Sequence, residues 1–130
     1  MGEKDLRAVN CQTLKVAIEA THMTQREVAG FLEVRPDTVN HALRGKMQVP
    51  EQWLVKLRNL AFQQKAAAEA RLKDWRHQGG EGTLSVTRSS NDDEARAAGW
   101  PCLSAETGML ANIWTALPEG TKLIVEAKAS

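Results

Sequence analysis

Four polar side chains recur at helical spacing in the first half of the chain: Asp37, Asn40, His41 and Arg44. Residues three, four and seven positions apart lie on one face of an α-helix, so a helix here would present a carboxylate, an amide, an imidazole and a guanidinium together. These groups donate and accept the hydrogen bonds by which base edges are read, and a helix about 10–12 Å thick fits a major groove about 12 Å wide. The pattern therefore predicts a DNA-reading helix, although solvated outer faces of helical bundles carry similar residues.

Local signals predict two short helices around this set. Thr24 and Glu27 have the spacing of a capping box, which fixes the start of the first helix. Pro36 suits the first turn of the second helix, where its missing N–H is not needed, and Gly45 stands where a glycine ends a helix. We expect helix, tight turn, helix, with each helix about ten residues long.

The apolar residues of this region show which face is buried. They recur at helical spacing and would pack the two helices against their neighbours: Val28, Leu32, Val39 and Leu43 against Leu14, Ile18 and Leu57. This packing leaves Arg35 and the four polar residues exposed. Gln25 and Arg26, at the start of the first helix, and Lys46, beyond the second, could then hold phosphates on either side.

The chain divides at "HQGGEG", residues 77–82, because three glycines in four positions do not continue a helix. Before it, one long helix is predicted from Pro50 to about Arg76. After it come a strand at 83–87, a short helix near 92–99, a helix at 104–117 and a strand at 122–127. We expect a mainly α protein with a DNA-binding domain at 1–76 and a small α+β domain at 83–130. Two strands form no stable sheet alone, so this unit must share a core with the long helix or with a second copy.

Composition narrows the function classes. Residues 1–76 hold 13 Lys and Arg against 9 Asp and Glu, and residues 77–130 hold 4 against 7. The net positive charge of the first part favours binding to a polyanion. Cys11 and Cys102 form no CxxC pair and are expected to be reduced, packed thiols, and the three histidines lack ligand spacing, so no metal or cofactor is expected. No nucleophile and base are spaced for catalysis, so we expect no enzyme. Without a spanning segment or signal peptide, we expect a cytoplasmic protein.

Met23–Leu57 resembles the helix-turn-helix of the phage repressor and Cro (XRE) family. The resemblance lies in the Thr-Gln start, Val28-Ala29, the Val34 turn, Thr38-Val39, Arg44-Gly45-Lys46 and Pro50, and it covers about residues 10–62. It implies a lambda-repressor-like bundle that binds duplex DNA. By this resemblance Pro36, Asp37, Asn40 and His41 fall where relatives read base edges, and Gln25 and Arg44 fall at positions that contact the DNA backbone. We predict base contacts by these four residues with Arg35 and Thr38, and phosphate contacts by Gln25 and Arg44 with Thr24, Arg26 and Lys46. The chain departs from its relatives at Arg35, where a serine cap is usual, and at Pro36.

"GWPCLSAETGMLANIW", Gly99–Trp114, is similar to a segment of the YdiL-like and anti-CRISPR-associated (Aca) regulators. Those proteins have an N-terminal helix-turn-helix, a long helix and a small α+β unit that pairs two protomers. The resemblance implies a homodimer. We expect aromatic and apolar anchors at the dimer interface: Trp75, Trp100, Met109 and Trp114. Trp53, at helical spacing with Leu57, is expected in the core.

These observations together predict a homodimeric, sequence-specific transcriptional regulator, a repressor of its own or a neighbouring operon, that reads an inverted repeat. Two alternatives stay open. One is an antitoxin whose C-terminal part neutralises a toxin while the helix-turn-helix autoregulates. The other is an adaptor whose polar helix face contacts only protein.

Overall fold

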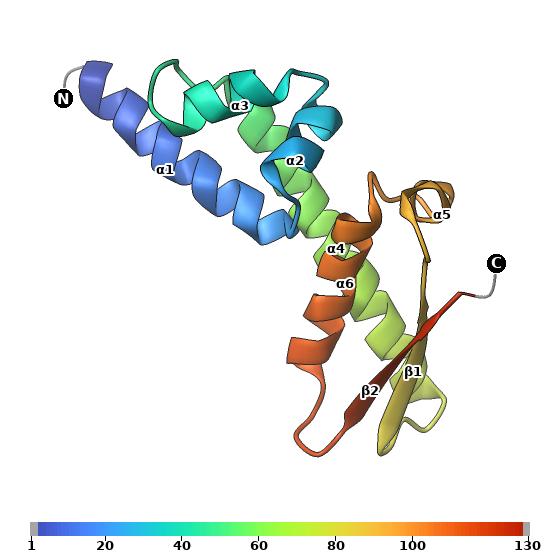
Figure 1. Cartoon of the computed structure of the whole chain (residues 1–130). Helices are drawn as coiled ribbons and strands as arrows, with labels where there is room; N and C mark the ends of the chain where they lie inside the picture. The colour runs from blue at the N-terminus through green and yellow to red at the C-terminus, as the bar shows by residue number, and fades with distance from the viewer. Residues whose placement is uncertain (1–2, 129–130) are drawn as a thin grey trace. The chain divides into compact units, whose positions relative to one another are not determined.

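The computed structural model describes residues 3–128, which contain six α-helices and two β-strands (Figure 1). These residues form two compact units that meet between Ala61 and Phe62, inside the helix α4 (Glu51–His77). No described helix combines the length and the apolar character needed to cross a membrane.

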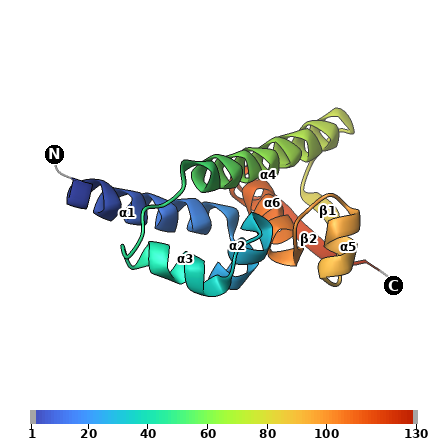
Figure 2. The same cartoon turned by 90° about the horizontal axis from the view of Figure 1, so that it is seen from above.

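The first unit contains α1 (Glu3–Thr21), α2 (Gln25–Leu32), α3 (Pro36–Leu43) and the first part of α4. Helix α3 packs against both α1 and α2 (Figure 2). The core includes the apolar residues that were predicted to be buried, among them Trp53: Leu14, Ile18, Val28, Leu32, Val39, Leu43, Trp53 and Leu57.

Local features define where α2 and α3 begin and end. The Thr24 hydroxyl accepts from the Glu27 N–H, and a Glu27 carboxylate oxygen accepts from the Thr24 N–H at 2.9 Å, so the predicted capping box is confirmed. Glu33 ends α2 in the left-handed conformation at φ 59°, unusual for a non-glycine residue. Pro36 opens α3, and Gly45 ends it at φ 73°, where the Lys46 N–H donates to the His41 carbonyl.

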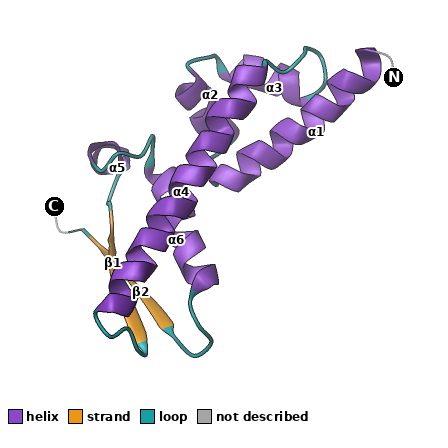
Figure 3. Cartoon of the chain, turned by 180° about the vertical axis from the view of Figure 1, so that it is seen from behind, coloured by secondary structure: helices purple, strands orange, loops and turns teal. Residues whose placement is uncertain are grey.

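The second unit contains the rest of α4, β1 (Thr83–Arg88), α5 (Asp92–Ala97), α6 (Leu103–Ala116) and β2 (Lys122–Ala127). The two strands run parallel side by side, with Leu84 opposite Leu123 and Val86 opposite Val125 (Figure 3). A parallel pair needs a long crossover, and α5 and α6 supply it. The buried residues of this unit include Leu72, Leu84, Val86, Trp100, Ala105, Met109, Leu110 and Ile113.

The mainly helical fold with a small α+β unit agrees with the sequence prediction. The division between the compact units, however, lies inside α4 rather than at residues 77–82. Two hydrogen bonds explain the difference, because the side-chain amides of Gln63 and Gln64 donate to the carbonyls of Gly99 and Ala105. Leu72 is also buried. The second half of α4 thus completes the core of the C-terminal unit. We had expected that unit to share a core either with the long helix or with a second copy of itself.

Candidate functional site

Three predicted base readers, Asp37, Asn40 and His41, and the predicted phosphate contact Arg44 share one side of α3, and the predicted reader Arg35 directly precedes the helix. Arg35, Asp37, His41 and Arg44 are exposed and Asn40 is half-buried, and we call these five residues the α3 outer face. Within the described part of the chain, none of their side chains makes a hydrogen bond or ion pair to another protein group. Their donors and acceptors are therefore available to an external partner.

The rest of the helix explains why these side chains face outward. Val39 and Ala42 are fully buried and Leu43 nearly so, which fixes the rotation of α3 about its own axis. Arg35 is the N-cap residue, but its side chain makes no capping hydrogen bond and stays exposed. Of the two remaining predicted readers, Pro36 is exposed but has no side-chain hydrogen-bonding group, and Thr38 is half-buried.

The residues predicted to hold phosphates lie at the ends of the two short helices. Gln25 and Arg26 are exposed in the first turn of α2, whose main-chain N–H groups carry the positive end of the helix dipole. Arg44 and Lys46 are exposed where α3 ends. Thr24 has a structural role, because its hydroxyl oxygen accepts the capping hydrogen bond from Glu27 at 3.2 Å. Only its hydroxyl proton remains for an outside acceptor.

The four predicted interface residues do not form one surface. Trp100 and Met109 are only 8% and 3% exposed in the single chain. Their prediction as dimer-interface residues is therefore wrong, because both are buried in the core of their own unit. The second half of α4, which we had assigned to the DNA-binding domain, belongs to the same unit. Trp75 is half-buried, and its indole N–H donates to the Thr83 carbonyl at 3.0 Å. Trp114 alone of the four is largely exposed, at 66%.

One buried polar cluster was not anticipated from the sequence. Glu106, on α6, is buried and accepts from the Ser89 N–H and the Ser89 hydroxyl, each at 2.7 Å. Its carboxylate thus provides a hydrogen-bond acceptor for the main-chain N–H group directly after β1. The available signal was its position among Ala105, Met109 and Leu110 on the apolar side of the helix, where a charged residue needs a partner.

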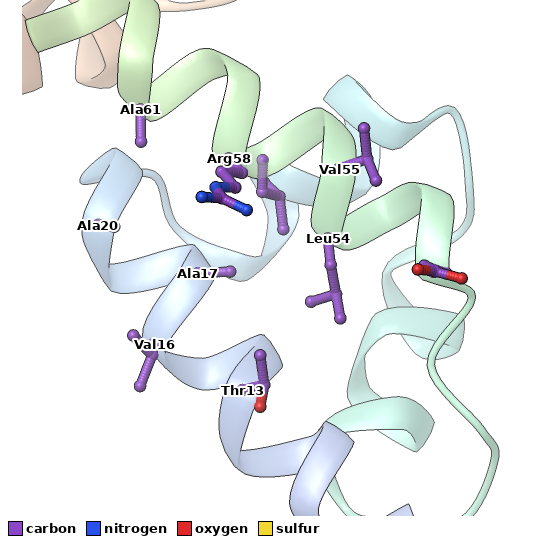
Figure 4. A pocket seen from close by; sticks show the side chains of 10 residues that line it. Thr13, Val16, Ala17, Ala20, Leu54, Val55, Arg58 and Ala61 are labelled. Carbon is purple, nitrogen blue, oxygen red and sulfur yellow. The ribbon is translucent and has the colours of Figure 1, made fainter.

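Each unit also has an open apolar groove. In the first unit it lies between α1 and α4, has a volume of about 390 Å³, and is lined by small and branched residues around Arg58 (Figure 4). Val16 and Val55 on its rim are exposed. In the second unit the groove lies between α6 and β2, measures about 380 Å³, and is lined by Trp114, Leu110, Leu123 and Val125 among others.

Both cysteines are buried free thiols, as expected, and the Cys11 thiol donates to the Leu43 carbonyl. Among the residues that the structure describes, no three His, Cys, Asp or Glu side chains gather where they could hold a metal ion. No protein-family model matches the chain, and no curated protein matches it. The arrangement of side chains on α3 must therefore carry the functional argument.

Proposed function

We propose that the protein is a homodimeric, sequence-specific DNA-binding regulator of transcription, in which α2 and α3 act as a helix-turn-helix. The observation that carries the proposal is the α3 outer face, whose polar side chains make no hydrogen bond or ion pair with the described residues while the opposite side of the helix is buried in the core. A polar helix face held rigidly from behind suits insertion into a major groove.

Each residue has a definite role in this proposal. Asp37 accepts from a cytosine amino group, Asn40 pairs with adenine, and His41 contacts a neighbouring base edge. Arg44 and Lys46 hold phosphates at one end of α3, and Gln25 and Arg26 do so at the start of α2. Phosphate contacts set the position of the helix, while base contacts decide the sequence.

A dimer of this kind would read an imperfect inverted repeat with half-site centres about 34 Å apart, one turn of DNA. Binding should weaken steeply with salt, because each neutralised phosphate releases counterions. Bound to its own promoter or a neighbouring one, such a protein would act as a repressor.

The direct test is selection of bound duplexes from a random DNA pool by the full chain. We expect an inverted repeat to be enriched over successive rounds. Recovery of sequences indistinguishable from the starting pool, at low salt and with folded protein, would overturn the proposal. A protein-only adaptor would in addition show no salt-dependent retention of DNA.

The exposed groove beside Trp114 supports a second candidate, an antitoxin that binds DNA through α3 and a toxin through the C-terminal unit. The discriminating observation is the neighbouring reading frame. If that frame is toxic when expressed alone and harmless with this protein, the antitoxin function holds; a harmless neighbour excludes it for that pair.

A further inference from the structure

The outer edges of the two strands differ. In β1, the Thr83 carbonyl accepts from the indole of Trp75, and the Ser89 N–H beyond the strand donates to the Glu106 carboxylate. Thr83 and Ser89 thus point away from β2, whereas the carbonyls of the even-numbered residues Gly82 and Arg88 accept from the N–H groups of Lys122 and Lys128. The β1 edge is therefore closed at both ends by side chains of its own unit.

The outer edge of β2 has no such cover in the described residues. The Lys122 N–H donates to the carbonyl of Gly82, directly before β1, and the N–H of Lys128, directly after β2, donates to the Arg88 carbonyl. With the observed register, the even-numbered residues of β2 therefore face β1. The main-chain groups of Leu123 and Val125 therefore point away from the sheet. An open strand edge of this kind is a template for pairing with another strand.

The first five residues of β2, Lys-Leu-Ile-Val-Glu, are complementary to the same five residues read in the opposite direction. If two copies pair antiparallel about Ile124, Lys122 of each lies opposite Glu126 of the other, and Leu123 lies opposite Val125. Leu123 and Val125 are also the residues whose main-chain groups are free, so each such pair exchanges both hydrogen bonds. Moving the register by two residues in the C-terminal direction places Lys122 opposite Lys128, which is repulsive.

Apolar exposure points to the same strand. Ile124 and Val125 are 44% and 43% exposed, and they lie on opposite faces of the sheet. Val125 and Leu123 line the groove of about 380 Å³ that Trp114 borders. A second β2 strand would bring another Leu123 and Val125 to the open side of this groove and would place the two Ile124 side chains against each other.

We propose that β2 pairs antiparallel with β2 of a second copy of this chain, about a two-fold axis at Ile124, so that the two small sheets become one continuous sheet. The register is set by the two Lys122–Glu126 pairs, and Trp114 packs over the Leu123–Val125 pairs. This inference rests on the dimer in the proposed function and gives it a surface and a register.

The test is sedimentation equilibrium of the full chain without DNA, on two single variants and their mixture. Lys122→Glu places four acidic groups across the axis and Glu126→Lys places four basic ones, so each variant alone should dissociate about tenfold more readily at low salt. A one-to-one mixture restores opposite charges at both pairs. It should therefore associate about as tightly as the unaltered chain, as should the double variant Lys122→Glu/Glu126→Lys.

Two control variants carry the same charge changes outside the pairs, Lys128→Glu and Glu81→Lys, and both should leave association unchanged. Circular dichroism checks that every variant is folded. A monomeric unaltered chain, single variants that associate normally, or a mixture that stays dissociated would each overturn the pairing. A monomeric chain would also refute the homodimer of the proposed function, whereas the other two outcomes would refute only the pairing through β2. A charge-dependent dimer that selects no DNA sequence would instead refute the proposed function and leave the pairing intact.

Discussion

Polar side chains serve different purposes in two regions of the molecule. On the α3 outer face, Asp37, Asn40, His41 and Arg44 make no hydrogen bond or ion pair within the described residues. In the segment 89–106 the same kinds of residue are engaged: Asn91 accepts from the Glu94 N–H, Asp92 from the Leu103 N–H, and Glu106 from the Ser89 N–H.

The difference separates groups that stabilise the fold from groups that the fold only displays. A side chain that satisfies a main-chain N–H contributes to stability, and its loss leaves a donor unpaired. A side chain that bonds only to water can be removed at little cost to the fold. Substitutions on the α3 outer face should therefore change DNA binding with little change in stability, and those in 89–106 should do the reverse.

The largest effect is expected at Glu106. Glu106→Ala removes both acceptors of Ser89 in a buried site, and we expect a loss of about 2–4 kcal/mol in the free energy of unfolding, measured by urea titration. Glu106→Gln keeps an acceptor and should lose distinctly less. DNA affinity measured on the folded fraction should be unchanged; a large loss of affinity with normal stability would contradict the comparison.

On the α3 outer face, Asn40→Ala should remove discrimination at one base pair, worth about 1–3 kcal/mol. The measurement is competition between the selected operator and single-base variants of it. His41→Ala serves as the matched variant and should relax preference at a different position. Equal losses on operator and random DNA for both variants would show that neither residue reads a base.

Arg44→Ala should weaken binding to every sequence alike. If Arg44 neutralises one phosphate, its loss lowers the slope of log affinity against log salt by about one. Affinity titrations at several salt concentrations give this slope, with Arg96→Ala as a control, because Arg96 is already paired with Asp93 at 2.7 Å. An unchanged slope would place Arg44 away from the DNA backbone.

Asp37 and Asp92 form a matched pair, since each is an exposed aspartate in the first turn of a helix. Asp92 accepts from the Leu103 N–H at 2.8 Å, at a helix start where Cys102 offers no side-chain cap. Asp92→Ala should lower the free energy of unfolding by about 1 kcal/mol. Asp37→Ala should lower it by less, roughly 0.5 kcal/mol from the helix dipole, while it alters base preference. If thermal melts show that Asp37→Ala and Asp92→Ala lower the melting temperature equally, this difference between the two aspartates is refuted.

The smallest expected change is a gain. Glu33 ends α2 at φ 59°, ψ 42°, where a side chain is strained, so Glu33→Gly should raise stability by about 0.5 kcal/mol after the added freedom of the unfolded chain is subtracted. Gly45→Ala, at φ 73°, is the opposite change and should destabilise. Neither touches the α3 outer face, so a change in base preference in either variant would show that the binding surface depends on these turns.

Much of the fold was predictable because its signals are local. The apolar periodicity and the capping box of Thr24 and Glu27 place α2 and α3, and alternation in Leu84 and Val86 places β1. The orientation of the α3 outer face followed from the same periodicity, since burial of Val39 and Leu43 fixes which residues face outward. Asn40 is the partial exception, being half-buried where full exposure was expected.

The C-terminal unit was harder to predict because its contacts join distant parts of the chain. Trp100 and Met109 looked like interface anchors when the unit was thought to lack a core, yet Gln64, Ala68 and Leu72 of α4 help to provide one. The parallel pairing of β1 with β2, and therefore the open edge of β2, depends on the path through α5 and α6. No pattern inside either strand specifies that pairing.

The sequence by itself determined approximately where most helices and strands lie and which residues of each are apolar, because these depend on neighbours within about one helical turn. Only the tertiary structure decided which polar side chains form hydrogen bonds with other parts of the protein. Glu106 and Asn40 are both polar residues on helices, and packing makes the first a partner of the main chain and leaves the second to face outward. A hydrogen bond between residues distant in the chain needs both partners in place, and the fold alone brings them together.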